Sequence, residues 1–286
     1  MGVLDGKVAV ITGSSHGLGL SIAEAYALEG AAVVLAARSS NALNKAVEKL
    51  IQHGAKASSL LTDVGELNQV KALADHAVET FGKIDIWVNN AGISGVYGPT
   101  ASIDPALFER VIRTNIFGVY YGSLVGLQHF LSQGAGGKLI NMLGRGDRQP
   151  IKYQSAYASS KTWVRNFTLA LAKEYARTGI GVYALNPGLM DTELLRKVDA
   201  VKGYEKKLKP LSAVIRMWAE PLSVPTEKAV WLASPATDKK TGLDIQVLGT
   251  ARLVKGPIRE LKRIIARQPA PDTTLDITTI APYKMF

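Results

Sequence analysis

The chain has 286 residues, 47% of them hydrophobic and none of them cysteine. This length suits one large α/β domain, the apolar content argues against disorder, and the lack of cysteine excludes disulfides and thiol chemistry. Apolar runs such as 8–11 are far shorter than the roughly 20 residues that cross a bilayer, and no export signal opens the chain, so we expect a cytoplasmic protein.

The formal net charge is +10, and the excess of Lys and Arg falls mainly after residue 195. Such runs indicate a solvated surface, attraction of an anionic substrate or lipid surface, or nucleic-acid binding. No nucleic-acid-binding module with interleaved aromatics is recognisable, so we expect no nucleic-acid partner. The four histidines are scattered without ligand spacing, so we expect no metal site.

Short β-rich runs alternate with longer helical runs along the chain, which predicts βαβ units. The predicted strands are 7–12, 32–37, 56–62, 84–88, 138–143, 181–185 and 244–248. The predicted helices run to about residue 30 after the first strand, and then over 41–53, 66–81, about 105–131 and 153–178. The pattern predicts a single α/β domain, a doubly wound Rossmann-type parallel sheet of about seven strands flanked by helices.

Two segments fall outside this alternation. Residues 193–224 mix basic with apolar and aromatic residues after the sixth strand, where an amphipathic insert can cover a ligand crevice. We interpret this insert as a substrate lid, and a helical hairpin that only caps the core is the alternative. We expect residues 1–250 to form the dinucleotide-binding domain with this lid. Residues 251–286 would form a C-terminal extension, with a basic helical piece (258–267) that offers a membrane contact and an extended tail.

The first strand runs into a glycine-rich turn and then an apolar helix. Gly13 permits a tight turn, Gly17 lets the backbone approach a pyrophosphate, and Gly19 lets the helix pack closely on the strand. Free N–H groups at a helix start hold phosphates. We therefore expect a dinucleotide to contact the following residues of the turn: Gly13, Ser15, His16, Gly17, Leu18 and Gly19.

The second strand ends at Ala37 and Arg38, where an NAD-binding protein generally has an acid for the ribose 2′-hydroxyl. A guanidinium at this place suits a 2′-phosphate, and Ser39 adds a hydroxyl. The sequence therefore predicts a preference for NADP(H), although Arg38 as an ordinary surface charge is the alternative.

Further motifs follow in order along the chain: Asp63-Val64, Asn89-Asn90-Ala91-Gly92, Asn115, Tyr157-Ala158-Ser159-Ser160-Lys161 and Asn186-Pro187-Gly188 with Thr192. Together with the glycine turn, they resemble the short-chain dehydrogenase/reductase family over about residues 5–250. The resemblance implies an NADP(H)-dependent oxidoreductase that transfers a hydride between the nicotinamide and a small carbonyl or alcohol, and that forms homodimers or homotetramers.

The resemblance also implies roles for these residues. Asp63 would bond the adenine amino group, Asn90 would line the cofactor and stabilise the central strand, and Thr192 would meet the nicotinamide carboxamide. Further cofactor contacts are implied at the following residues: Val64, Ala91, Gly92, Pro187 and Gly188.

Tyr157 and Lys161 are four residues apart, so a helix places them on one face. A nearby ammonium and a bound nicotinamide cation would lower the pKa of the phenol from near 10 by about three units. We expect Tyr157 to exchange a proton with the substrate oxygen, while Lys161 also suits the ribose hydroxyls. The resemblance adds Asn115, as the support of a water chain that delivers protons.

One position departs from the family pattern. The serine that would bond the substrate oxygen, 13 positions before Tyr157, is Gly144 here. Losing such a donor typically costs on the order of 100- to 1000-fold in rate. Arg145, Tyr153 or a water could replace it, or the substrate could be an imine, a conjugated double bond or a self-polarised carbonyl. Alternatively, the protein binds NADP(H) as a sensor or scaffold with little hydride transfer. We expect substrate contacts at these residues: Gly144, Arg145, Tyr153 and Met190.

Overall fold

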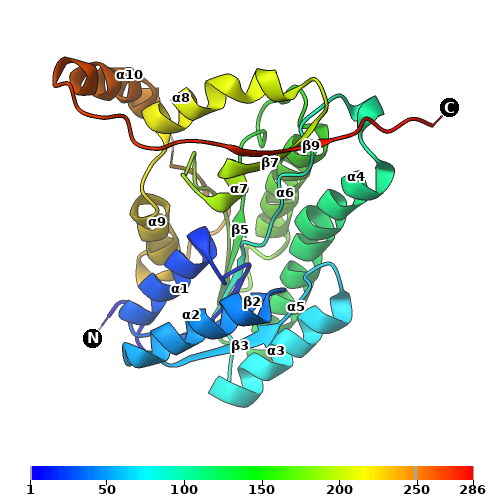
Figure 1. The fold of residues 1–286 in the computed structure, drawn as a ribbon. Coiled ribbons are helices and arrows are strands. Elements are labelled where there is room, and N and C mark those ends of the chain that lie inside the picture. The colour runs from blue at the N-terminus through cyan, green and yellow to red at the C-terminus, as the bar shows by residue number, and fades with distance from the viewer. Residues whose placement is uncertain (1, 248–249, 286) are drawn as a thin grey trace.

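A seven-stranded parallel sheet forms the centre of the protein, with strand order β3-β2-β1-β4-β5-β6-β8 (Figure 1). The computed structural model describes residues 2–247 and 250–285, and all their side chains except those of residues 250–255 and 259. The strands of the sheet are β1 (Val8–Thr12), β2 (Ala32–Ala37), β3 (Ala57–Leu61), β4 (Ile86–Asn89), β5 (Gly137–Met142), β6 (Ile180–Asn186) and β8 (Asp244–Gln246).

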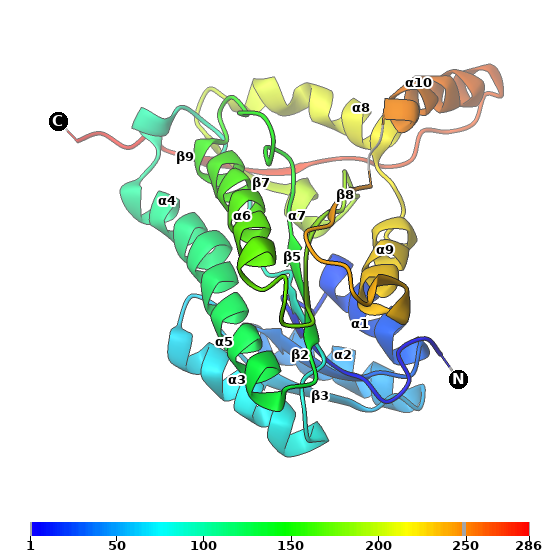
Figure 2. The same ribbon diagram turned by 180° about the vertical axis from the view of Figure 1, so that it is seen from behind.

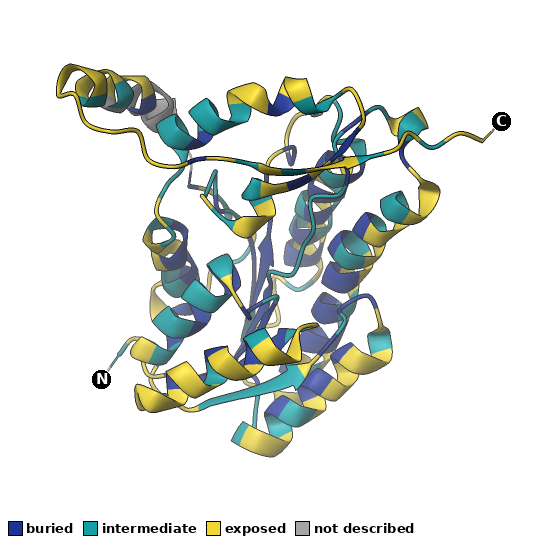
Figure 3. Cartoon of the chain, viewed as in Figure 1, coloured by how far each residue is buried: buried dark blue, intermediate teal, exposed yellow. Residues whose placement is uncertain are grey.

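Strand β1 lies in the middle of this sheet, between β2 and β4. All five of its residues are buried. Ile11 packs into the hydrophobic core on one face of the sheet, and Val10 packs into the core on the other. A strand covered on both faces needs a continuous apolar run rather than an alternating one. Figure 3 shows this burial along the central strands and the inner faces of the helices.

Helices cover both faces of the sheet (Figures 1 and 2). The helices of one face are α1 (Gly17–Leu28), α2 (Ser40–Gln52) and α9 (Ser223–Ala233). Those of the other face are α3 (Leu67–Phe81), α5 (Gly118–Gln133) and α6 (Ser155–Glu174). The predicted doubly wound α/β fold of a single domain is therefore confirmed.

Beyond small shifts of element ends, the structure differs from the predicted elements in two places. The expected helix over 105–131 is divided into α4 (Pro105–Ile112), a π-helical turn (Arg113–Phe117) and α5. Helix α9 was not predicted as a separate element, although Ala229 and Leu232 are fully buried in it. The predicted end of the last strand, Leu248, lies outside the described residues.

The insert after β6 is not a helical hairpin, so that alternative is wrong. It consists of α7 (Glu193–Arg196), β7 (Lys197–Val201), a 3-10 turn η3 (Glu205–Leu208) and α8 (Lys209–Trp218). β7 pairs in parallel with β9 (Asp276–Ile280) of the C-terminal extension, so that the extension crosses over the insert (Figure 1).

The rest of the extension leads from α10 to β9. Helix α10 (Thr250–Ile265) lies next to α8 and projects beyond the body of the protein, at the upper left of Figure 1. The last residue, Phe286, is outside the described residues. Among the helices that the structure describes, none has the length and apolar character needed to cross a membrane.

Candidate active site

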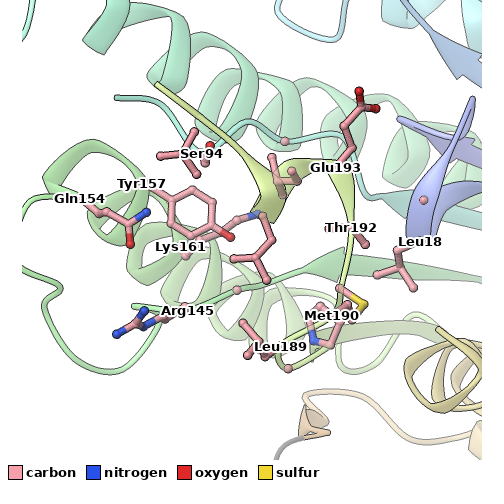
Figure 4. A pocket seen from close by; sticks show the side chains of 18 of the residues that line it. Leu18, Ser94, Arg145, Gln154, Tyr157, Lys161, Leu189, Met190, Thr192 and Glu193 are labelled. Atoms are coloured by element: carbon pink, nitrogen blue, oxygen red, sulfur yellow. The ribbon is translucent and has the colours of Figure 1, made fainter. Parts of the chain in front are cut away.

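A pocket of about 430 Å³ lies at the carboxyl ends of β1, β4, β5 and β6 (Figure 4). Parallel α/β sheets bind ligands at this edge, where the strand order reverses. The pocket collects most of the predicted site residues, from segments far apart in sequence. Those that line it are Gly13, His16, Gly17, Leu18, Gly19, Asn90, Ala91, Gly92, Gly144, Arg145, Tyr157, Lys161, Pro187, Gly188, Met190 and Thr192.

The glycine turn has the shape that a dinucleotide phosphate requires. No atom lies within 4 Å of the place where a Cβ of Gly17 would be, and the backbone there is left-handed, with φ +58°. A Cβ on Gly19 would instead lie 2.5 Å from the Asn90 amide nitrogen. The turn is therefore open towards the pocket at Gly17 and closed against the sheet at Gly19, which fits a phosphate held at the start of α1.

Asn90 joins this turn to the end of β4. Its side-chain nitrogen donates to the carbonyl oxygens of Thr12 (2.9 Å) and Gly13 (3.0 Å). Its backbone nitrogen donates to the Thr12 hydroxyl at 3.0 Å. These three bonds cross between neighbouring strands, so Asn90 keeps the turn in position while it also lines the pocket.

Tyr157 and Lys161 extend from α6 into the floor of the pocket (Figure 4). The Lys161 ammonium lies 5.8 Å from the centre of the phenol ring and donates to the Met142 carbonyl at 3.0 Å. Burial, with a smaller contribution from the carboxylate of Asp147, raises the pKa of Tyr157 to about 12. Burial lowers the pKa of Lys161 to about 8, an effect that Asp147 opposes.

These directions differ from the expected acidic phenol. Removing a charged group from water penalises its charged form, so burial keeps the phenol protonated and weakens the ammonium. In the chain by itself, this effect dominates the pKa of the phenol. The expected acidic phenol depends on a bound nicotinamide cation as well as on the ammonium, so it stays a prediction.

Asn115 is buried in the π-helical turn and does not line the pocket. Its amide oxygen accepts from the Ile93 nitrogen at 2.9 Å, while its amide nitrogen donates to the Ile93 carbonyl and the Ser160 hydroxyl, both at 3.0 Å. Asn115 thus connects the loop after β4 to α6. Both of its N–H groups are occupied, and only its oxygen keeps a free acceptor direction.

Gly144 contacts the phenol of Tyr157 directly. A Cβ at this position would overlap the Tyr157 hydroxyl, and it would lie 3.3 Å from the ring carbon that carries the hydroxyl. It would also lie 3.5 Å from Cε of Lys161. The space of the missing side chain is therefore filled by the phenol, not left as an empty cavity for a water.

The remaining predicted cofactor residues lie outside this pocket, at the ends of β1, β2 and β3. These residues are Ser15, Arg38, Ser39, Asp63 and Val64. The Arg38 guanidinium lies 3.9 Å from the Asp63 carboxylate, so the two residues are neighbours there. The hydroxyl of Ser15 is 2.9 Å from Nδ1 of His16, and Nε2 of His16 is 3.7 Å from the Glu193 carboxylate of the insert.

The insert supplies the apolar roof of the pocket. Its lining residues are Leu194, Leu195, Val198, Lys207, Leu208, Pro210, Leu211 and Val214. Backbone hydrogen bonds fix the insert to neighbouring segments. The Val201 nitrogen donates to the Tyr97 carbonyl at 2.9 Å, and the Lys202 nitrogen donates to the Ile280 carbonyl at 2.8 Å.

Tyr153 does not line the pocket, unlike the other predicted substrate contacts. It has a left-handed backbone with φ +67°, and its ring packs edge-on against Tyr97 (5.5 Å) and Tyr204 (5.1 Å). Non-glycine residues seldom adopt this conformation, and such strain is concentrated at functional sites.

Sequence reasoning missed Tyr97 and Asp147, among other residues of the site, whereas Ser94 lies within the stretch 92–96 that it placed in the pocket. Ser94 and Tyr97 line the pocket from the loop after β4. Asp147 is 6% exposed and accepts from the Gln246 amide at 3.3 Å, and its charge acts on both Tyr157 and Lys161. A signal for Tyr97 existed, because it follows the Asn-Asn-Ala-Gly motif at the carboxyl end of a strand.

Comparison with known proteins agrees with this geometry. A family model described as short chain dehydrogenase matches residues 7–203. The chain belongs to the short-chain dehydrogenase/reductase family. It is 35% identical over 257 residues to 3beta-hydroxysteroid dehydrogenase 1 of Eggerthella lenta, which covers 88% of this chain and 96% of that relative.

Two solved structures of short-chain dehydrogenase/reductases have the same fold. A gluconate 5-dehydrogenase from Burkholderia cenocepacia, in complex with NADP and tartrate, matches with TM-score 0.75 and 29% identity over 85% of this chain and 94% of its own. An actinorhodin polyketide ketoreductase with NADPH matches with TM-score 0.77 and 30% identity over 87% of this chain and 98% of its own. The protein is therefore an oxidoreductase of this family. Its relatives are named for a steroid, a sugar acid and a polyketide, so membership does not choose the substrate.

Proposed function

We propose that the protein is an NADP(H)-dependent oxidoreductase that interconverts an alcohol and a carbonyl in a bulky, largely apolar small molecule. The observation that carries this proposal is the placement of Tyr157 and Lys161 on the floor of a pocket that continues into the glycine turn. The fit of a dinucleotide is supported by the open backbone at Gly17. When bound, the nicotinamide supplies or accepts the hydride.

The chain's own residues then handle the proton and the orientation. Tyr157, protonated at neutral pH, donates its proton to the substrate oxygen in reduction. Lys161 is positioned by the Met142 carbonyl and lies beside Gly92, which suits bonds to ribose hydroxyls. Asn115 acts as a positioning residue for Gly92 and α6 through its bonds to Ile93 and Ser160.

Gly144 takes the place of the family's serine, and we propose that its lack of a side chain makes room for the phenol of Tyr157. The phenol of Tyr157 sits where a side chain at 144 would be, so the single hydroxyl of Tyr157 contacts the substrate oxygen without a second donor from β5. Ser94, which lines the same pocket, is the hydroxyl available to add a bond from the opposite loop. We therefore propose Ser94, rather than Tyr153 or a water beside Gly144, as the group that replaces the serine hydroxyl.

The preference for NADP(H) rests on Arg38. Its guanidinium is exposed at the end of β2, and its distance from Asp63 is long enough for it to turn towards a 2′-phosphate. Fluorescence titration of the purified protein with NADPH and NADH tests this. We expect at least tenfold tighter binding of NADPH, and we expect Arg38→Gln to remove the difference. Equal affinities in the wild-type protein would contradict the proposal.

Hydride transfer is tested by NADPH oxidation with a panel of ketones, enones and imines. Tyr157→Phe is the control, and we expect it to reduce kcat by roughly 100- to 10000-fold while NADPH still binds. A sensor or scaffold with little hydride transfer is the second candidate, because the raised pKa of Tyr157 and the glycine at 144 both disfavour catalysis of oxidation. NADPH binding without turnover of any panel compound would favour that candidate.

Two surfaces suggest how the protein associates. Phe117, Tyr120 and Leu131, at or next to α5, are 41–47% exposed and suit self-association of subunits as a homodimer or homotetramer.

α10 carries the exposed apolar residues Ile264 and Ile265. We propose that this helix contacts an anionic lipid surface, which its basic residues would attract.

A further inference from the structure

The entrance of the active-site pocket carries positive charge that no described carboxylate neutralises. Arg145, Lys152 and Lys207 all line the pocket and are exposed to solvent. Within the described part of the chain, no ion pair joins any of these three residues to an acid. Among the described residues that line the pocket, Glu193 is the one acid, and it is engaged by Lys197 and faces His16 of the glycine turn.

Two of these cations, Lys152 and Lys207, come from different parts of the chain and lie over the same aromatic ring. The Lys152 ammonium lies 5.1 Å from the centre of the Tyr153 ring, and the Lys207 ammonium lies 5.6 Å from the same centre. Lys152 precedes α6, whereas Lys207 belongs to the insert. Arg145 and Lys152 also both act electrostatically on the phenol of Tyr97, whose ring packs against Tyr153.

The Tyr153 ring is positioned at a cost in backbone energy. Tyr153 holds its left-handed conformation with its carbonyl accepting from the Gly98 nitrogen at 3.0 Å. Such a conformation in a non-glycine residue is strained and persists only where its surroundings enforce it. Here it places one ring between Tyr97 and Tyr204 and beneath two ammonium groups. Cations above aromatic faces are held in place while their charge stays available to a ligand.

We propose that the substrate is an apolar carbonyl compound with a carboxylate, and that Arg145 and Lys207 bind this carboxylate at the pocket entrance. The inference rests on the proposed function. Arg145 directly follows Gly144, which contacts the Tyr157 hydroxyl, and both residues line the same pocket, so a substrate that reaches Tyr157 extends past Arg145 towards the solvent. Its planar fork suits a carboxylate. The apolar part of the substrate then lies against the leucines and valines of the insert.

Paired substrates test this specificity without knowledge of the natural one. NADPH-dependent reduction of 4-oxo-4-phenylbutyrate is compared with that of its methyl ester, which has the same ketone and no charge. We expect the wild-type kcat/KM to favour the acid by on the order of tenfold, because two partly screened charges contribute. In Arg145→Gln/Lys207→Gln this acid-to-ester ratio falls to about one, and KM for the acid rises.

Lys206→Gln is the matched control, because Lys206 is exposed beside Lys207 but does not line the pocket. It should keep the wild-type ratio. A wild-type ratio near one, or an equal fall in Lys206→Gln, overturns the proposal, since the second result reports the general field of a chain with net charge +10.

A binding measurement separates this inference from the proposed function. Calorimetric titration with 4-phenylbutyrate and 4-phenylbutyramide, in the presence of NADP, requires no hydride transfer. Tighter binding of the acid, lost in Arg145→Gln/Lys207→Gln, supports the anion site even if neither ketone is reduced. Equal binding of acid and amide overturns it, even if both ketones are reduced.

Discussion

Replacement of Gly144 by alanine tests whether the phenol occupies the space next to β5 in the working enzyme. A Cβ at 144 would lie 3.3 Å from the ring carbon that bears the Tyr157 hydroxyl, so the hydroxyl itself falls within its van der Waals radius. The hydroxyl must move by about 1 Å to restore an ordinary contact. A displacement of this size at a reacting group costs about 100-fold in rate. We therefore expect Gly144→Ala to lower kcat by about 100-fold.

The serine variant carries the same Cβ together with a new donor. Oxyanion donors contribute roughly 100- to 1000-fold, so Gly144→Ser should recover much or all of the rate that Gly144→Ala loses. The two variants therefore separate displacement of the phenol from the value of the hydroxyl. Steady-state ketone reduction, with NADPH affinity and melting temperature as controls for folding, gives the comparison. A wild-type kcat in Gly144→Ala would refute the reasoning, because it would show that the working position of the phenol tolerates a Cβ at 144.

The other predictions concern Lys161, the tail and α10. Burial lowers the pKa of Lys161 to about 8, so the unfolded chain binds more protons between pH 8 and its ordinary pKa of 10.5, and wild-type stability rises with pH in that window. Between pH 7 and pH 10.5, the free energy of unfolding of the wild type, measured with urea, should rise by about 3 kcal/mol more than that of Lys161→Met. If the two proteins show the same dependence of this free energy on pH, the prediction is contradicted. Removal of residues 275–286 takes away β9, so KM for ketones should rise about tenfold while NADPH affinity is unchanged. An unchanged KM would show that β9 does not hold the insert. Ile264→Gln/Ile265→Gln should abolish sedimentation with phosphatidylglycerol vesicles, whereas phosphatidylcholine vesicles should bind neither protein. Retained sedimentation would exclude α10 as the contact.

The parts of the fold that could be predicted are those encoded locally. The glycine turn, Asn90 and the pair Tyr157 and Lys161 follow recognisable strands or share one helix face, so spacing alone places them. β9 could not be placed in this way, because it pairs with β7 across about 75 intervening residues. Its Thr-rich sequence resembles an extended tail, and only the position of its partner strand makes it part of the cover.

The pKa shifts in the site were predicted less well than the residues that form it. An i, i+4 pair suggests that amine and phenol interact, but the spacing does not tell how deeply they are buried. Lys161 is 4% exposed, and Asp147, which acts on both groups, enters from a loop beyond β5. In the chain alone, desolvation therefore raises the pKa of the phenol, and a lowered pKa depends on the charge of the bound cofactor.

The raised pKa bears on the protonation state of Tyr157. A phenol with a pKa of about 12 is almost wholly protonated at neutral pH, so Tyr157 is in the state that donates a proton to a carbonyl oxygen. Oxidation of an alcohol needs the phenolate, which the buried site disfavours more strongly than water does. Gly144 acts in the same sense, since it allows the phenol to sit deep against β5 beside Asp147, whose negative charge also opposes ionisation. The chain's own groups thus keep Tyr157 protonated, and the phenolate that oxidation needs must draw on the positive charge of the oxidised cofactor.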